Sequence, residues 1–121
     1  MDALERRMEL GELLALYGNL LTPKQAHILN LYINQDLSLS EIAAQEGISR
    51  QGIHDALRRG ENSLNHWEDA LGLLKNEQHL QKQLTTLRIG LQNLNIAPGE
   101  SKKKAYLLEQ IDTLLAIDTS G

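Results

Sequence analysis

The sequence predicts an all-α protein in which a helix-turn-helix unit is followed by a helical hairpin. Two observations carry this prediction. Leucine fills 25 of the 121 positions, whereas valine and phenylalanine are absent and tryptophan occurs once. Leucine is a good helix former, while strands favour β-branched and aromatic residues. The leucines also recur in steps of three and four, which is the period of one helix face.

Two helices are predicted before residue 37. Apolar residues at helical spacing fill residues 10–21, and this helix should weaken near Gly18 or continue in distorted form. Thr22 followed by Pro23 is a good start signal, because a hydroxyl caps free amides and proline suits the first helical position. The helix that begins there should end at residues 34–36.

The helix-turn-helix is predicted by a short run of capping residues. Ser38 and Glu41 have the spacing of a capping box, in which each side chain bonds the other residue's backbone amide. The helix that they open is short, since Gly47 follows within nine residues and can adopt the left-handed conformation that ends a helix. Ser49 can cap the next helix. A short helix, a glycine turn and a capped second helix define the motif.

The second helix of the motif is predicted to be long. It should begin near Arg50 and continue past Gly60, with a kink or short break around residues 72–77 where the apolar pattern changes phase. Gly60 marks a weak point or a close approach of another helix. The apolar positions along this helix are Ile53, Leu57, Leu64, Trp67, Leu71 and Leu74.

A helical hairpin should follow. A second leucine seam precedes a turn at residues 95–99, and a last helix is expected at about 101–117. We therefore expect a single all-helical domain, with a helix-turn-helix unit at 2–69 and the hairpin at 70–121. The second seam consists of Leu80, Leu84, Leu87, Leu91 and Leu94.

The second seam has two interpretations. It can fold back on the first unit as ordinary core, or pair with the same seam of a second chain. Because few aromatic residues are present to fill a separate core, we favour a homodimer in which these five leucines form the dimer or partner interface.

The exposed face of the long helix carries the chemistry of base reading. Arginine bridges the two acceptors of guanine, and glutamine bonds the corresponding groups of adenine. A serine at a helix start suits a phosphate, and flanking basic residues hold the DNA backbone. We predict that bases are read by Arg50, Gln51, His54 and Arg58, and that the backbone is held by Lys24, Ser49 and Arg59.

The charge balance limits this interpretation. The formal net charge is −4, and between Thr22 and Trp67 four basic residues face five acidic ones. Phosphate neutralisation supplies much of DNA affinity, so a monomer should bind weakly and a dimer should double the basic contacts. The alternative is a helix-turn-helix that only packs or binds a partner.

Several function classes are disfavoured. The chain has no cysteine, its longest strictly apolar run is residues 13–16, and no signal-peptide pattern opens it. The four histidines lack metal-ligand spacing, and no phosphate loop or nucleophile elbow occurs. We therefore expect a cytoplasmic protein without membrane insertion that is not an enzyme and uses no cofactor and no metal.

Four stretches carry a family resemblance. LLTPKQ (20–25), LY (31–32), DLSLSEIA (36–43) and GISRQ (47–51) resemble the YlxM-like proteins, which are small bacterial helix-turn-helix proteins. The same region is similar to region 4 of bacterial sigma factors, which reads the −35 promoter element. The resemblance extends over nearly the whole chain, as far as residues 114–118. It implies an all-helical fold with sigma-region-4-like topology.

The resemblance also implies a cellular context. Genes of these proteins typically lie beside those of the signal recognition particle GTPase and its receptor, which implies a regulatory role in that targeting pathway. This sequence departs from the family pattern at Gly52, His54 and Gly60. The resulting hypothesis is a homodimeric regulator that binds double-stranded DNA and is linked to protein targeting. The alternative is a non-catalytic component that binds protein or RNA of the signal recognition particle pathway.

Overall fold

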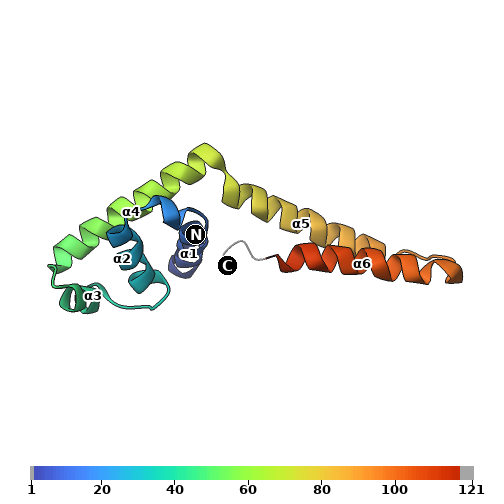
Figure 1. Ribbon diagram of the computed structural model, residues 1–121, viewed down its shortest axis with the longest axis horizontal. Coiled ribbons are helices and arrows are strands. Elements are labelled where there is room, and N and C mark those ends of the chain that lie inside the picture. Colours follow the sequence, from blue (N-terminus) through green and yellow to red (C-terminus); the bar gives the residue numbers. More distant parts are fainter. Residues whose placement is uncertain (1, 118–121) are drawn as a thin grey trace. The chain divides into compact units, whose positions relative to one another are not determined.

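The computed structural model describes residues 2–117, and within this part every secondary-structure element is a helix. The all-α prediction is confirmed. The chain forms two compact units, the first ending at Leu74 and the second beginning at Lys75. The helices are α1 (Ala3–Tyr17), α2 (Pro23–Ile33), α3 (Leu39–Glu46), α4 (Arg50–Leu71), α5 (Leu73–Gln92) and α6 (Ser101–Ala116), with 3₁₀ turns η1 (Gly18–Leu20) and η2 (Pro98–Glu100) (Figure 1).

Side-chain caps begin the helices of the first unit. The Thr22 hydroxyl accepts from the Gln25 amide at the start of α2, and the Ser38 hydroxyl accepts from the Glu41 amide at the start of α3. In return, the Glu41 carboxylate accepts from the Ser38 amide at 3.0 Å, which completes the predicted capping box. Ser49 caps α4. The predicted starts of these three helices are confirmed.

The core of the first unit lies between α4 and the three helices before it (Figure 1). Gly60 is buried in the middle of α4, and a Cβ atom placed there would lie 2.6 Å from Leu29 Cδ1. The glycine therefore marks a close approach of α2 to α4, and α4 continues through it as predicted. The largest fully buried side chains are Leu13, Tyr17, Ile28, Leu29, Ile42, Ile53 and Leu64.

The predicted irregularities also occur. The first helix gives way to a 3₁₀ turn at Gly18, and α4 ends at Leu71 before Gly72, which has φ 64°. The break is therefore a left-handed glycine at the first position of the expected range. No helix of residues 2–117 has the length and apolar composition needed to cross a membrane.

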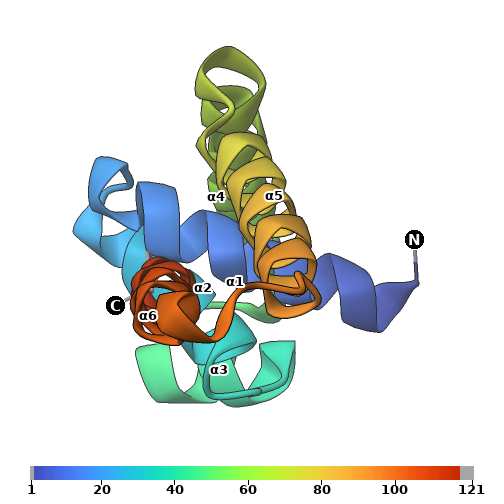
Figure 2. The ribbon, with the colours of Figure 1, turned by 90° about the vertical axis from the view of Figure 1, so that its right-hand side faces the viewer.

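The second unit is an antiparallel hairpin in which α5 and α6 run alongside each other (Figure 1), and α6 is seen nearly end-on in Figure 2. Arg88 on α5 pairs with Asp112 on α6. At the tip, the Lys104 ammonium donates to the carbonyl oxygens of Gln92 at 2.8 Å and Leu94 at 3.1 Å. A cation in the first turn of α6 thus stabilises the C-terminal end of α5, where a positive charge is favourable.

Of the five leucines in the predicted seam, Leu80, Leu84, Leu87 and Leu91 lie on α5 at steps of four, three and four residues. Leu94 lies beyond α5, which ends at Gln92. Leu84 is buried and Leu91 is half-buried, whereas Leu80 and Leu87 are 55% and 61% exposed. The four leucines differ in exposure because α6 covers only the side of α5 that carries Leu84 and Leu91. Sequence spacing could not reveal which leucines this neighbour would cover.

Candidate nucleic-acid interface

The turn of the helix-turn-helix is fixed by backbone geometry. Gly47 ends α3 in the left-handed conformation, with φ 67° and ψ 30°. The amide of Ile48 then donates to the carbonyl of Ala43 at 3.2 Å, which satisfies one of the free carbonyl groups at the end of α3. Two residues after Gly47, Ser49 caps α4. The chain thus passes from α3 to α4 in three residues.

The start of α4 retains donors for an anion. The Ser49 hydroxyl oxygen accepts from the Gly52 amide at 3.0 Å, so one of its two lone pairs is engaged while its proton can still be donated. The first amides of a helix have no partner within the helix and carry a partial positive charge. This end of α4 therefore has the chemistry of a phosphate contact.

The base-reading residues predicted on α4 share its exposed side. Ile53 and Leu57 face the core, while the long polar side chains on the opposite side of the helix extend into solvent. Arg50 and Arg58 are two helical turns apart. The residues brought together in this way are Arg50, Gln51, His54, Arg58 and Arg59, and all five are exposed.

Asp55 lies among these residues and had no role in the sequence prediction. Its Oδ1 atom accepts from Gln51 Nε2 at 3.0 Å, and His54 Nδ1 lies 3.7 Å from the same oxygen. The Gln51–Asp55 spacing of four residues is the signal that could have indicated this bond. Gln51 keeps its carbonyl oxygen and one amide hydrogen free for another partner.

Lys24 is placed apart from the α4 cluster. It is exposed in the first turn of α2, a helix that packs against α4. Within the described part of the chain, no hydrogen bond or ion pair joins Lys24 to the α4 residues. Its predicted role as a backbone contact requires a ligand long enough to reach both helices.

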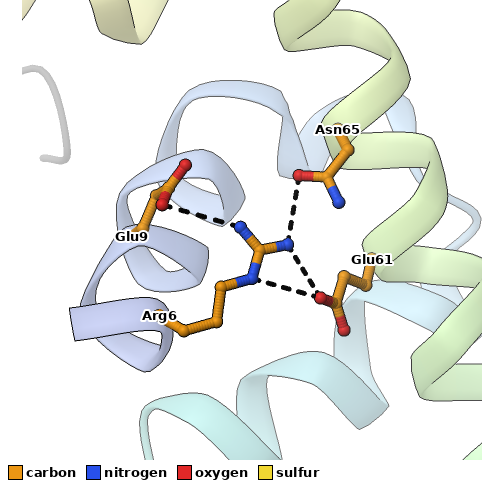
Figure 3. Close-up of polar contacts among 4 residues, drawn as sticks. All are labelled: Arg6, Glu9, Glu61 and Asn65. Carbon is orange, nitrogen blue, oxygen red and sulfur yellow. Dashed lines mark hydrogen bonds and ion pairs between the residues drawn. The ribbon is translucent and has the colours of Figure 1, made fainter. Parts of the chain in front are cut away.

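Arg6 engages an acidic residue of α4. Its guanidinium donates to Glu61 Oε1 at 2.7 Å and to Asn65 Oδ1 at 3.2 Å, and it lies 3.6 Å from Glu9 (Figure 3). This network joins α1 to the middle of α4 and compensates the Glu61 charge. Sequence analysis missed it, because Arg6 and Glu61 are 55 residues apart in the chain.

Arg7 fixes the loop that leads into α3. Its guanidinium pairs with Asp36 at 2.8 Å, donates to the Tyr32 carbonyl and lies 4.6 Å from the centre of the Tyr32 ring. Asp36 itself has φ 56°, a left-handed conformation that its short polar side chain tolerates. The charge of Asp36 is thus also compensated from α1.

The acidic and basic residues of this region differ in their partners. Asp36, Glu46 and Glu61 each pair with a basic or histidine side chain. Glu41 serves the capping box, where hydrogen bonds from the backbone and hydroxyl of Ser38 lower the pKa of its carboxyl group. Asp55 is engaged with Gln51 and His54.

The basic residues of the same region remain available. Among residues 2–117, no ion pair involves Lys24, Arg50, Arg58 or Arg59. The chain as far as Leu74 is acidic overall, with six basic and eleven acidic residues, so any positive charge is confined to the surface around these four unpaired cations. Positive potential is therefore expected to concentrate at the first three turns of α4.

The short α3, the left-handed glycine turn and the exposed, capped α4 define a helix-turn-helix protein. Comparison with known families agrees, because residues 4–113 match the UPF0122 family, described as "Putative helix-turn-helix protein, YlxM / p13 like". The chain belongs to this family, as its resemblance to YlxM-like proteins predicted.

Curated relatives extend over most of the chain. The UPF0122 protein of Acetivibrio thermocellus is 37% identical over 111 residues, which cover 90% of this chain and 92% of the relative. A UPF0122 protein of Listeria monocytogenes is 36% identical over 108 residues, covering 89% and 98%. The UPF0122 protein of Clostridium kluyveri is 44% identical over 79 residues, covering 65% and 71%.

Proposed function

We propose that this chain is a DNA-binding regulatory protein of the helix-turn-helix type that acts as a homodimer on double-stranded DNA. The observation that carries the proposal is that the acidic residues around the motif have partners, whereas its basic residues make no ion pair. Each acidic residue from Thr22 to Trp67 is engaged within the described fold, whereas Lys24, Arg50, Arg58 and Arg59 make no ion pair there. Unpaired cations on the second helix of such a motif suit DNA phosphates and base edges.

In this proposal α4 enters the major groove with its first turns. Arg50 and Arg58 are eight residues apart, which separates them by about 12 Å along the helix axis. This distance lets the two guanidinium groups reach different base pairs. Arginine prefers guanine, and the free amide groups of Gln51 suit adenine. His54 lies between them on the same exposed side.

The backbone contacts come from the edges of the motif. The Ser49 hydroxyl and the first amides of α4 bind one phosphate, and Arg59 and Lys24 bind flanking phosphates. Few phosphates are contacted, so a monomer has low affinity and a modest dependence on salt. Two copies double the number of phosphate contacts and so the salt dependence, and they raise the affinity far more than twofold because binding free energies add, which is why the proposal includes a homodimer.

The experiment is a selection of genomic duplex fragments by the purified full-length chain at physiological salt. Wild-type protein should enrich a recurring motif, and Arg50→Ala should lose it. Lys82→Ala is the matched control, because Lys82 is an exposed cation of the hairpin and its loss should leave the motif intact. Absence of enrichment by the wild type would contradict the proposal.

The link to the signal recognition particle pathway belongs to the same proposal and is supported by the family resemblance. Regulation of targeting genes would appear as enrichment of fragments near the genes of that pathway. Enrichment confined to unrelated loci would contradict this link while leaving DNA binding intact.

A second candidate function is that of a non-catalytic component that binds protein or RNA of that pathway. The observation that favours it is the set of exposed leucines on the hairpin, including Leu80, Leu87 and Leu107. Under this alternative, acidic substitutions at Leu87 and Leu107 should abolish capture of purified particle components, while Arg58→Ala should have no effect. The reverse pattern would contradict it.

A further inference from the structure

The hairpin uses only part of its apolar surface internally. The side of α5 that faces α6 carries Leu84 and Leu91. The facing side of α6 carries Leu108, Ile111 and Leu115. All five are buried or half-buried, and we call them the inner seam. The Arg88–Asp112 pair runs beside this seam and joins the two helices. Two helices alone cannot cover more of each other, so other leucines remain outside.

Four of the outer leucines form two rows. Leu80 and Leu87 on α5 are 55% and 61% exposed, and Leu107 and Leu114 on α6 are each 48% exposed. Successive residues of a helix are about 100° apart, so the row on α5 lies about 40° from the centre of its inner seam and the row on α6 lies about 80° from the centre of its own. Both rows are offset in the same rotational sense, seen along the direction of their chain.

The antiparallel arrangement places both rows on one face. When two neighbouring helices run in opposite directions, offsets in the same rotational sense from their contact line point to the same side of the pair. Leu80, Leu87, Leu107 and Leu114 therefore share one side of the hairpin, which we call the open leucine face. Its apolar rows continue the inner seam toward solvent, as in half of a four-helix bundle.

The open leucine face carries no charge between its leucines. The positions that complete the two rows are Gln83 and Gly90 on α5 and Gln110 on α6. Gly90 lies inside a helix, where glycine costs about 1 kcal/mol relative to alanine, and a Cβ atom there would meet nothing within 4 Å. The fold of the chain itself does not require this glycine, whereas a closely approaching helix of another chain would.

The distribution of charge along the chain favours a second copy of this chain as the partner of the open leucine face. The chain as far as Leu74 has six basic and eleven acidic residues, while from Lys75 onward it has six basic and five acidic residues. Two copies repel each other through their first units and hardly at all through their hairpins. An uncharged apolar face is best matched by a surface of the same kind, and a second copy of the hairpin offers one.

We propose that two copies of this chain associate through their open leucine faces about a two-fold axis, forming a four-helix bundle of two hairpins. In a two-fold interface the same patch meets itself, so each copy contributes Leu80, Leu87, Leu107 and Leu114. Leu84 and Leu91 stay within each hairpin. The inference deepens the homodimer of the proposed function, and its test needs no DNA, so failure of either can be recognised separately.

The test is sedimentation velocity of the full-length chain over a wide concentration range. The wild type should sediment as a dimer at micromolar concentration, and the Leu87→Glu/Leu114→Glu double variant should sediment as a monomer, with dimer affinity reduced at least 100-fold. Ile89→Glu is the matched control, because Ile89 is 56% exposed on α5 but lies away from the open leucine face. It should stay dimeric, and circular dichroism should show equal helix content in all three proteins.

A second measurement uses the absence of cysteine from the chain. Single Leu87→Cys and Ile89→Cys variants are treated with a short bis-maleimide, and only the first should give cross-linked dimers in high yield. A monomeric wild type, a dimeric double variant, or preferential cross-linking through position 89 would each overturn the proposal.

Discussion

The phenol of Tyr17 donates a hydrogen bond to Glu68 Oε1 at 2.8 Å, joining the end of α1 to the last turn of α4. The same two groups also hold the start of α5, because Leu73 donates its amide to the Tyr17 oxygen at 3.1 Å and Leu74 donates to Glu68 at 3.0 Å. Tyr17 is 1% exposed. The ends of α1 and α4 and the first two residues of α5 therefore meet at one buried hydroxyl.

Tyr17→Phe should destabilise the first unit by about 1–3 kcal/mol. The substitution keeps the ring but removes a hydrogen bond to a carboxylate and leaves the Leu73 amide without its acceptor. Urea unfolding followed by circular dichroism measures the change. Tyr106→Phe is the control, since Tyr106 is 60% exposed, and an equal loss in both variants would contradict this role of Tyr17.

The effect of Tyr17 should depend on pH. Burial, together with the hydrogen bond to Glu68, raises the pKa of Tyr17 above its ordinary value of 10.0. Above pH 10 an unfolded tyrosine loses its proton while folded Tyr17 retains its own, so the unfolded state binds fewer protons and stability falls as pH rises. The stability difference between wild type and Tyr17→Phe should therefore be complete at pH 8 and shrink above pH 10. A difference that grows with pH would contradict the assignment.

The first unit could be predicted from sequence because local signals specify its helices. Thr22, Ser38 and Ser49 cap helices through bonds to residues three positions away, and Gly47 ends a helix through its own backbone conformation. Each signal acts within four residues. The exposed side of α4 follows from the same periodicity, which is why the candidate base-reading residues could be named.

Contacts between distant segments could not be predicted in this way. The pairs Arg6–Glu61 and Arg7–Asp36 depend on how α1 lies against the rest of the unit. The charge count from Thr22 to Trp67 omitted both arginines, and it therefore understated how far the acidic residues are compensated. The same limit applies to the second leucine seam, whose division between covered and open sides depends on where α6 lies.

Gly47→Ala and Gly72→Ala form a matched pair of backbone substitutions. Both glycines are left-handed, with φ 67° and φ 64°, and neither has an atom within 4 Å of an added Cβ. Each substitution should cost about 1–2 kcal/mol through backbone strain alone. We expect similar losses in thermal unfolding but a selective loss of DNA affinity in Gly47→Ala, which disturbs the turn before α4. Equal losses of DNA affinity would contradict the placement of the binding surface.

Leu84→Ala and Leu87→Ala test the division of the hairpin leucines. Leu84 is 9% exposed, so its truncation should destabilise the hairpin by about 2–3 kcal/mol. Leu87 is 61% exposed, and its truncation should change the stability of the monomer by less than about 0.5 kcal/mol. Thermal unfolding at low micromolar concentration and below checks both values. A large effect of Leu87→Ala that persists on dilution would show that Leu87 is covered within its own chain.

Arg58→Ala and Arg59→Ala distinguish base reading from backbone contact at adjacent positions of α4. Arg58→Ala should weaken binding to the selected duplex by about 1–3 kcal/mol and relax the base preference at one position of the motif. Arg59→Ala should weaken binding to all sequences alike and reduce the salt dependence by about one phosphate contact per chain. Fluorescence anisotropy at several salt concentrations gives the affinities, and a repeated selection gives the motif.

The two variants remove the same side chain from neighbouring exposed positions, so each serves as the control for the other. Both arginines lie on a helix whose core contacts come from Ile53 and Leu57, and neither substitution should alter thermal unfolding by more than about 0.5 kcal/mol. An unchanged motif in Arg58→Ala, combined with a relaxed one in Arg59→Ala, would mean that α4 is rotated in the groove from the orientation proposed here. Unchanged affinity in both would exclude α4 as the DNA-reading helix, because its exposed side would then contribute neither base nor phosphate contacts at these positions.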